Sequence, residues 1–142
     1  MEEILRKLTD KNNKTAYEFA KQLGVESALS DQYLEMIPMF AELLQDKRSY
    51  VRTRAFVLIC NQARWANNGQ IEAVFDKMLL LLNDSKPTVV RQCLSALHEV
   101  VLFRSELSKN VAEALAEIDL SRYKDSMLPL IENDIAALRS LL

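Results

Sequence analysis

The side chains with the greatest potential for chemistry are a single histidine, His98, and two cysteines, Cys60 and Cys93. One histidine excludes a histidine-rich metal centre and leaves only one imidazole to activate a serine or cysteine nucleophile. Cys93 and His98 are five residues apart in one apolar helical stretch, so they point to different faces of that helix. The three residues also lack the Cys-x-x-Cys or His-x-x-x-His spacing of metal sites. We therefore expect no catalytic residue, no metal and no cofactor.

The remaining catalytic motifs are missing as well. With 2 Gly and 3 Pro in the chain, a glycine-rich phosphate loop is nearly excluded. There is no dinucleotide-binding, Walker or glycosidase-like pattern. A pair of carboxylates could be assembled from several helices, but the sequence favours no particular pair. These observations predict a protein that is not an enzyme.

Charge is the most informative chemical pattern. Residues 22–46 contain five acids and no base, whereas residues 47–64 contain five bases and no acid. This segregation predicts either an acidic face and a basic face, or neighbouring helices that pair their charges across the surface. A basic face would favour acidic partners, such as an acidic peptide or a phosphate backbone.

These residues must be positioned by helices, because apolar residues recur at helical spacing almost throughout the chain. Breaks are expected near Gly24 and at residues 67–69, 84–87 and 119–121. Pro38 should kink the third helix. The pattern predicts about eight helices at approximately residues 2–9, 13–23, 31–45, 49–66, 70–83, 87–104, 108–117 and 124–142.

The overall composition limits the compartment and the partners. The formal net charge of −2 lacks the basic excess of a dedicated nucleic-acid-binding domain. Both cysteines lie in apolar stretches, which is typical of buried free thiols in a reducing compartment. The N-terminus begins with acids where a signal peptide needs bases, and no apolar run approaches the ~18 residues of a membrane span. We expect a cytoplasmic protein that makes no membrane contact.

An internal repeat organises the helices. Residues 44–58 and 82–97 superimpose with a period of about 39 residues. Each contains a helix end, an Asp, a short loop and the pattern Val-Arg-x-x-Ala/Leu-x-x-Leu. A weaker third copy at residues 131–138 has Glu132 in place of the Arg. Terminal repeats are often degenerate in this way, because they have a neighbour on one side only.

With this repeat the chain resembles the HEAT-repeat class of α-solenoids. The resemblance implies an all-α fold, a right-handed α-α superhelix of the HEAT/armadillo-like kind. The chain is also similar to short bacterial HEAT-like proteins called SufBD-like, a group that implies a fold but no settled activity. The motifs that carry this similarity are Val51-Arg52 and residues 63–65, 86–93, 119–127 and 134–135. We expect one domain over residues 1–142, with a helical pair at 1–30 and repeats at 31–69, 70–107 and 108–142.

In the HEAT class, a loop Asp and an early Arg of the second helix form a ladder between repeats. Asp46 with Arg52, and Asp84 with Arg91, fit these positions. A helical wheel places Arg52 on the packed side of its helix. That position suits a bidentate pair with either Asp46 or Asp84.

The other side of the same helix contains the binding candidates. Arg54 and Arg64 are expected on an exposed surface, and Trp65 at its margin is either a flat anchor for a ligand or part of the core. The resemblance implies that second helices line the concave face. The candidate binding residues are Arg54, Asn61, Arg64 and Trp65, with Tyr50 and Arg104 at lower weight.

The helix expected at 87–104 differs from the others because it is apolar nearly all round. Such a helix is either buried under flanking repeats or offers an apolar groove to a partner helix. His98 lies on its core side. Together these patterns predict a protein-binding module that takes an acidic or helical protein partner on its concave face. The alternative is a HEAT-like protein that binds the DNA backbone or a lesion, with binding that falls steeply with salt.

Overall fold

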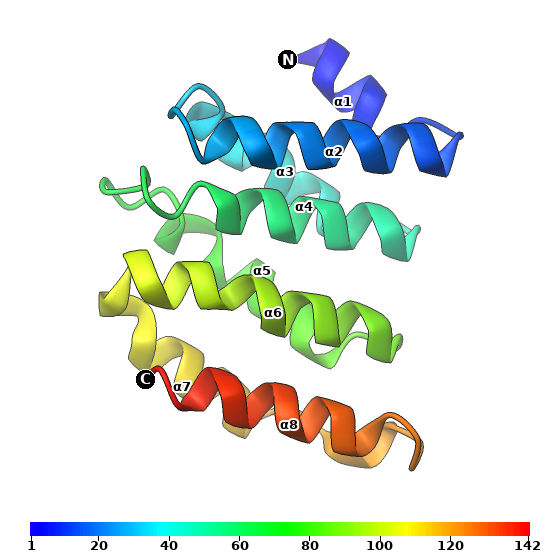
Figure 1. Cartoon of the computed structure of the whole chain (residues 1–142), viewed down its shortest axis with the longest axis vertical. Helices are drawn as coiled ribbons and strands as arrows, with labels where there is room; N and C mark the ends of the chain where they lie inside the picture. Colours follow the sequence, from blue (N-terminus) through cyan, green and yellow to red (C-terminus); the bar gives the residue numbers. More distant parts are fainter.

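The computed structural model describes all residues, 1–142, and its regular elements are all helices. Four long helices lie side by side and run in the same direction (Figure 1). These are α2 (Asn13–Ser27), α4 (Ser49–Asn61), α6 (Pro87–Phe103) and α8 (Leu128–Arg139), here called the long-helix layer. Behind them lies the short-helix layer, which consists of α3 (Ile37–Leu43), α5 (Phe75–Leu79) and α7 (Ser108–Ala116). The first helix, α1 (Glu2–Leu8), packs against α2 at the N-terminal end of the stack. The solenoid architecture predicted from the sequence is therefore confirmed.

Several helix boundaries differ from the prediction. Helix α2 continues through Gly24, where a break was expected, and ends at Ser27. Helix α3 begins at Ile37 rather than near residue 31, so Pro38 lies in its first turn and causes no kink there. The first turn tolerates proline because an amide at that position has no partner within the helix.

The short-helix layer is less regular than expected because each of its helices is preceded by a 3-10 turn. These turns are Leu34–Met36, Glu72–Val74 and Ser105–Leu107. A further 3-10 segment, Leu80–Asn83, follows α5 and shortens it to a single turn and a half. The tighter 3-10 geometry is common at helix ends and connectors.

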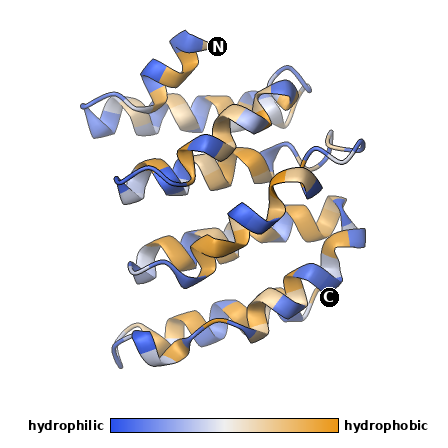
Figure 2. Ribbon diagram, turned by 180° about the vertical axis from the view of Figure 1, so that it is seen from behind, coloured by the Kyte–Doolittle hydropathy of each residue, from blue (hydrophilic) through white to orange (hydrophobic).

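The core lies between the two layers. A single connected cluster of 34 buried residues extends from Leu8 to Leu138. Figure 2 shows hydrophobic stretches in every helix, with hydrophilic residues concentrated in the connecting loops. Helix α6 is buried on two sides, since Leu94 and Leu97 are fully covered and so are Cys93 and Val100. The buried interpretation of this helix is therefore correct. Cys60 and Cys93 are unpaired, and burial raises the pKa of both thiols.

Two ion pairs connect α4 and α6 to the repeat that follows each of them, one through the loop before α6 and one through α8 itself. Arg52 donates to both carboxylate oxygens of Asp84, with Nε–Oδ2 and Nη2–Oδ1 distances of 2.9 and 3.0 Å. Arg91 in turn binds Asp134 on α8, with an Nε–Oδ2 distance of 2.7 Å. Of the two carboxylates left open for Arg52, the structure selects Asp84, and Asp46 accepts from Arg52 only through its backbone carbonyl, at 3.0 Å. The pair Asp84 with Arg91 is wrong, because Arg91 extends forward to Asp134. The carboxylate of Asp46 accepts instead from Arg48 at 3.0 Å.

Candidate functional site

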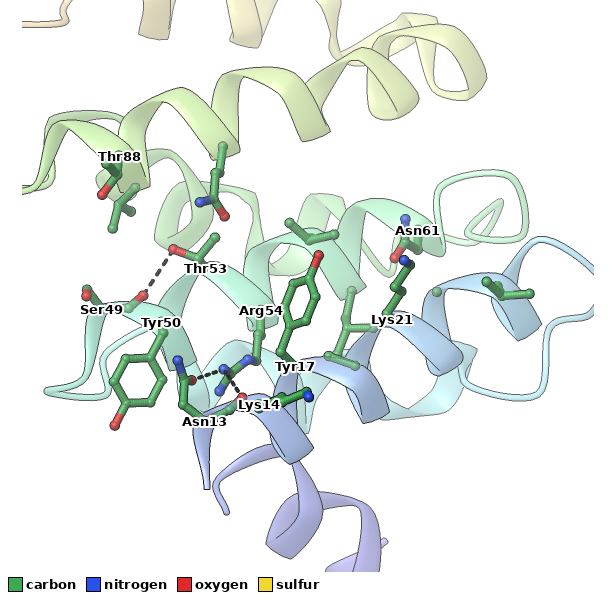
Figure 3. Close-up of a pocket in the computed structure, with 17 residues that line it drawn as sticks. Asn13, Lys14, Tyr17, Lys21, Ser49, Tyr50, Thr53, Arg54, Asn61 and Thr88 are labelled. Atoms are coloured by element: carbon green, nitrogen blue, oxygen red, sulfur yellow. Dashed lines mark hydrogen bonds between the residues drawn. The ribbon is translucent and has the colours of Figure 1, made fainter. Parts of the chain in front are cut away.

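A groove opens on the long-helix layer between α2, α4 and the beginning of α6 (Figure 3). Its volume is about 760 Å³. It follows α2 from Asn13 to Val25 and α4 from Ser49 to Asn61. At 1.5 Å per helical residue this is a length of roughly 18 Å. The groove therefore runs parallel to these two helices, and only the first turns of α6 close its far side.

The rim that α2 supplies is basic. Lys14 and Lys21 are both exposed and are two helical turns apart, with Tyr17 between them. Neither lysine has a carboxylate oxygen within the 4.0 Å of an ion pair. Glu18 is at helical spacing from both, yet it does not line the groove and pairs with neither. No Asp or Glu lines the groove, although the whole chain carries a net charge of −2.

The third cation of the groove is Arg54, which is only 8% exposed. The expectation that it lies on an open surface is wrong, because the end of α1 and the start of α2 cover it. Its guanidinium donates to the carbonyl oxygens of Leu8 and Asn13, at 3.5 and 3.2 Å, and to the side-chain oxygen of Asn13. It also lies 5.0 Å from the centre of the Tyr50 ring. These partners are all neutral.

The environment of Arg54 is unusual for a buried charge. Burial lowers its pKa, the Tyr50 hydroxyl raises it, and the neighbouring Arg48 lowers it again. An arginine remains protonated under such shifts. Buried charges are normally matched by an opposite charge, because desolvation of an isolated ion is costly. Arg54 therefore contributes a positive charge to the groove that the chain itself does not neutralise.

The floor and the far edge of the groove are uncharged. Ala20, Val57 and Leu58 form an apolar floor, beside which the Tyr17 ring stands 58% exposed. The edge opposite the lysines is built from the polar side chains of Ser49, Thr53, Thr88 and Gln92. Across its width, the groove thus changes from basic to apolar to neutral polar.

A glycine in α2 allows the two walls to approach at the far end of the groove. A methyl group added to Gly24 would lie 3.1 Å from the side-chain oxygen of Asn61 on α4. Contacts this short require the neighbour to shift. Asn61 itself is oriented by α6, since its amide donates to Glu99 Oε2 at 3.0 Å.

The remaining sequence candidates lie outside the groove, near the C-terminal ends of α4 and α6. Arg64 is half-buried, 3.7 Å from the Glu99 carboxylate and 4.7 Å from the centre of the Phe103 ring. The expectation of an exposed Arg64 is therefore also wrong, because α6 supplies both partners.

Trp65 and Arg104 have internal partners too. The Trp65 indole N–H donates to the Ser27 carbonyl at 2.7 Å, which joins the turn after α4 to the end of α2. Arg104 is 3.8 Å from Glu106, and its side chain is 19% exposed. Of the six candidates, Tyr50, Arg54 and Asn61 line the groove, and Arg64, Trp65 and Arg104 do not.

Sequence reasoning missed the basic rim. Lys14, Tyr17 and Lys21 lie in the N-terminal helical pair, which is outside the repeat that contains Arg54 and Arg64. Their spacing of three and four residues is the signal that could have identified them, because residues so spaced share one helix face.

The short-helix layer contains a smaller hollow of opposite charge. It has a volume of about 300 Å³ and lies between α5 and α7. Asp76, Glu113 and Glu117 line it, and no Lys or Arg does. The charged residues of the two hollows lie outside the acidic segment 22–46 and, except for Arg54, outside the basic segment 47–64. Three of the five cations of the basic segment form ion pairs within the chain, so the expected alternative of paired charges describes that segment better than a separate basic face. No three His, Cys, Asp or Glu side chains gather where they could hold a metal ion, and no helix is both long and apolar enough to cross a membrane.

Comparison with known proteins gives one family. The model of the family described as Cnd1, non-SMC mitotic condensation complex subunit 1, matches residues 27–127, which is more than two thirds of the chain. This match supports the HEAT-repeat resemblance and does not extend to the SufBD-like group. No curated protein and no solved structure matches the chain significantly.

Proposed function

The chain belongs to the Cnd1 family, a family of HEAT-repeat subunits of the mitotic condensation complex, and on that premise we propose that it is a non-catalytic module that binds another protein. The proposed site is the groove between α2, α4 and α6, and the proposed partner is an acidic protein segment. Membership of a family of complex subunits supports a protein partner in general. The groove supports the acidic character of that partner.

The observation that carries this proposal is the set of unmatched cations. Lys14, Lys21 and Arg54 line one groove that contains no carboxylate, whereas Arg52 and Arg91 are each paired within the chain. Complementary potentials steer partners to a surface and select against wrong ones. A segment rich in Asp and Glu would supply the missing negative charge.

The geometry narrows the binding candidates. Arg64 and Arg104 each have a carboxylate partner, so they contribute less to binding in this proposal. Trp65 is likewise assigned to packing against α2. The proposed binding residues are Tyr50, Arg54 and Asn61 from the sequence analysis, together with Lys14, Tyr17 and Lys21.

We further propose that residues 1–142 act as one unit, with the helical pair 1–30 as part of the site. One connected core from α1 to α8 supports this. A cytoplasmic location remains part of the proposal, supported by two thiols that are buried and unpaired.

The proposal is tested by affinity capture from the native lysate, with and without nuclease. The wild type is compared with Lys14→Glu/Lys21→Glu and with the control Lys77→Glu/Lys109→Glu, which reverses two exposed lysines of the short-helix layer. We expect a protein that survives nuclease, is retained by the control and is lost with the groove variant. Its binding segment, mapped by crosslinking, should be acidic. Recovery of nuclease-sensitive material alone would overturn the proposal in favour of a nucleic-acid partner.

A further inference from the structure

The shape and charge of the groove specify the partner more closely than its acidity alone. Resting on the proposed function, we propose that the occupant is one amphipathic α-helix that lies parallel to α2 and α4, with two acidic residues seven positions apart and two apolar residues between them. The acidic pair faces Lys14 and Lys21, and the apolar residues contact the floor and the Tyr17 ring.

The length of the groove favours a helix of about three turns. The lining of α2 and α4 extends along both helices for roughly 18 Å, which is about 12 residues of helix. A partner helix in this position would pack into the space between two parallel helices, as amphipathic helices do in apolar grooves.

The spacing of the cations sets the spacing of the acids. Lys14 and Lys21 are seven residues apart on one face of α2, so their side chains rise from the rim about 10.5 Å apart along the helix. Acids at positions i and i+7 of a parallel or antiparallel helix have the same separation. Two acids at i and i+5 would lie on different faces, and only one could meet the lysine rim.

The cross-section of the groove sets the rest of the pattern. Between the two acids, residues i+3 and i+4 of the partner point toward the floor of Ala20 and Val57 and toward the exposed Tyr17 ring. Leu or Met at these positions would cover apolar surface that now faces solvent. The far side of the partner meets Thr88 and Gln92, which can accept neutral polar residues.

Arg54 explains why acids are favoured over neutral residues along the whole groove. Its charge is held near the N-terminal ends of α2 and α4 by the Leu8 and Asn13 oxygens, and no carboxylate neutralises it. It adds positive potential beneath the rim without needing to change position when a partner binds.

The test uses two labelled peptides of about 14 residues with identical composition. In the matched peptide, two Glu residues are at i and i+7, with Leu at i+3 and i+4; in the shifted peptide the second Glu is moved to i+5. Fluorescence anisotropy is measured for the wild type, Lys14→Glu/Lys21→Glu and the control Lys77→Glu/Lys109→Glu. We expect the matched peptide to bind the wild type and the control at least about fivefold more tightly than the shifted peptide, and the groove variant to lose about tenfold in affinity.

A charge swap separates docking from loss of fold. A peptide with Lys at i and i+7 should bind the Lys14→Glu/Lys21→Glu variant better than it binds the wild type. Equal binding of the matched and shifted peptides, with both lost in the groove variant, would overturn the helix register and leave only the proposed binding of acidic segments by the basic groove. Absence of binding up to about 1 mM peptide, or binding that ignores the lysines, would also overturn the inference. Its failure is distinguishable from that of the proposed function, because lysate capture would still depend on the same lysines.

Discussion

Arg52 and Arg54 are two residues apart on α4, yet they belong to two different regions of the molecule. Arg52 lies in the ladder, where its guanidinium donates hydrogen bonds to both oxygens of the Asp84 carboxylate. Arg54 lies in the groove, where its partners are carbonyl and amide oxygens and the Tyr50 ring. The first cation is matched by an anion of the same chain and serves the fold. The second has no anionic partner in the chain, and although it is buried it adds positive potential to the groove.

The largest expected effect is the loss of a ladder pair. Arg52→Met keeps much of the aliphatic stem but leaves the Asp84 carboxylate, whose side chain is 8% exposed, without a counter-ion. Removal of one member of a buried pair costs about 3 kcal/mol or more. We expect the free energy of unfolding, measured by urea denaturation, to fall by this amount. A loss below about 1 kcal/mol would show that this ladder pair contributes no more to stability than a surface ion pair does.

The groove arginine should matter less for stability. Arg54→Met removes hydrogen bonds to the Leu8 and Asn13 oxygens but leaves no carboxylate without a counter-ion. We expect a loss of about 1–2 kcal/mol in the same urea experiment. Arg54→Lys should recover part of it. If Arg54→Met is more destabilising than Arg52→Met, the division between ladder and groove is wrong.

The loop before α4, which belongs to neither the ladder nor the groove, should respond to acid. The Arg48 guanidinium and backbone N–H hold the pKa of Asp46 below its ordinary value of 3.8. A lowered pKa in the folded state means that the stabilisation is complete above 3.8 and is lost as the pH falls through the folded-state value. Asp46→Asn should therefore cost about 0.5 kcal/mol at neutral pH, since the pair is partly exposed, and nothing at strongly acidic pH. Thermal denaturation over a pH series measures this difference, and a constant cost at every pH would contradict it.

The smallest expected effect sharpens the description of the rim. Glu18 lies between Lys14 and Lys21 in sequence, is exposed and forms no ion pair. Glu18→Gln removes a negative charge near the lysines without touching the groove lining. We expect affinity for the matched acidic peptide to rise by about twofold and the stability to change by less than ~0.5 kcal/mol. Decreased affinity would mean that Glu18 orients the lysines.

Much of the fold could be predicted from the sequence because the repeat encodes it. The Val-Arg pattern located the starts of α4 and α6 and the ladder arginines. It could not show which acid each arginine meets, because Asp46 is near Arg52 in sequence and Asp84 is far from it, and only the stacking of repeats brings the distant acid within reach. The structure shows that Arg52 extends forward to Asp84.

The candidate site was less predictable. A helical wheel placed Arg54 opposite the core side of its own helix, but it carries no information about α1, whose end covers that side. The lysines of α2 lie outside the recognised repeats, so the sequence does not indicate that they share a groove with α4. Only the packing of the two helices side by side brings them together. The pattern of one helix does not show which residues from distant segments of the chain will pack beside it.

The central claim is that the unmatched cations of the groove bind an acidic helix, and a heteronuclear NMR titration of the labelled protein with the matched peptide tests it most directly. Backbone amide shifts should change along α2 from Asn13 to Val25, along α4 from Ser49 to Asn61 and at the start of α6. Residues that line the acidic hollow, such as Asp76 and Glu113, should be unaffected. Shift changes centred on α5 and α7, or spread evenly over both layers, would contradict the account.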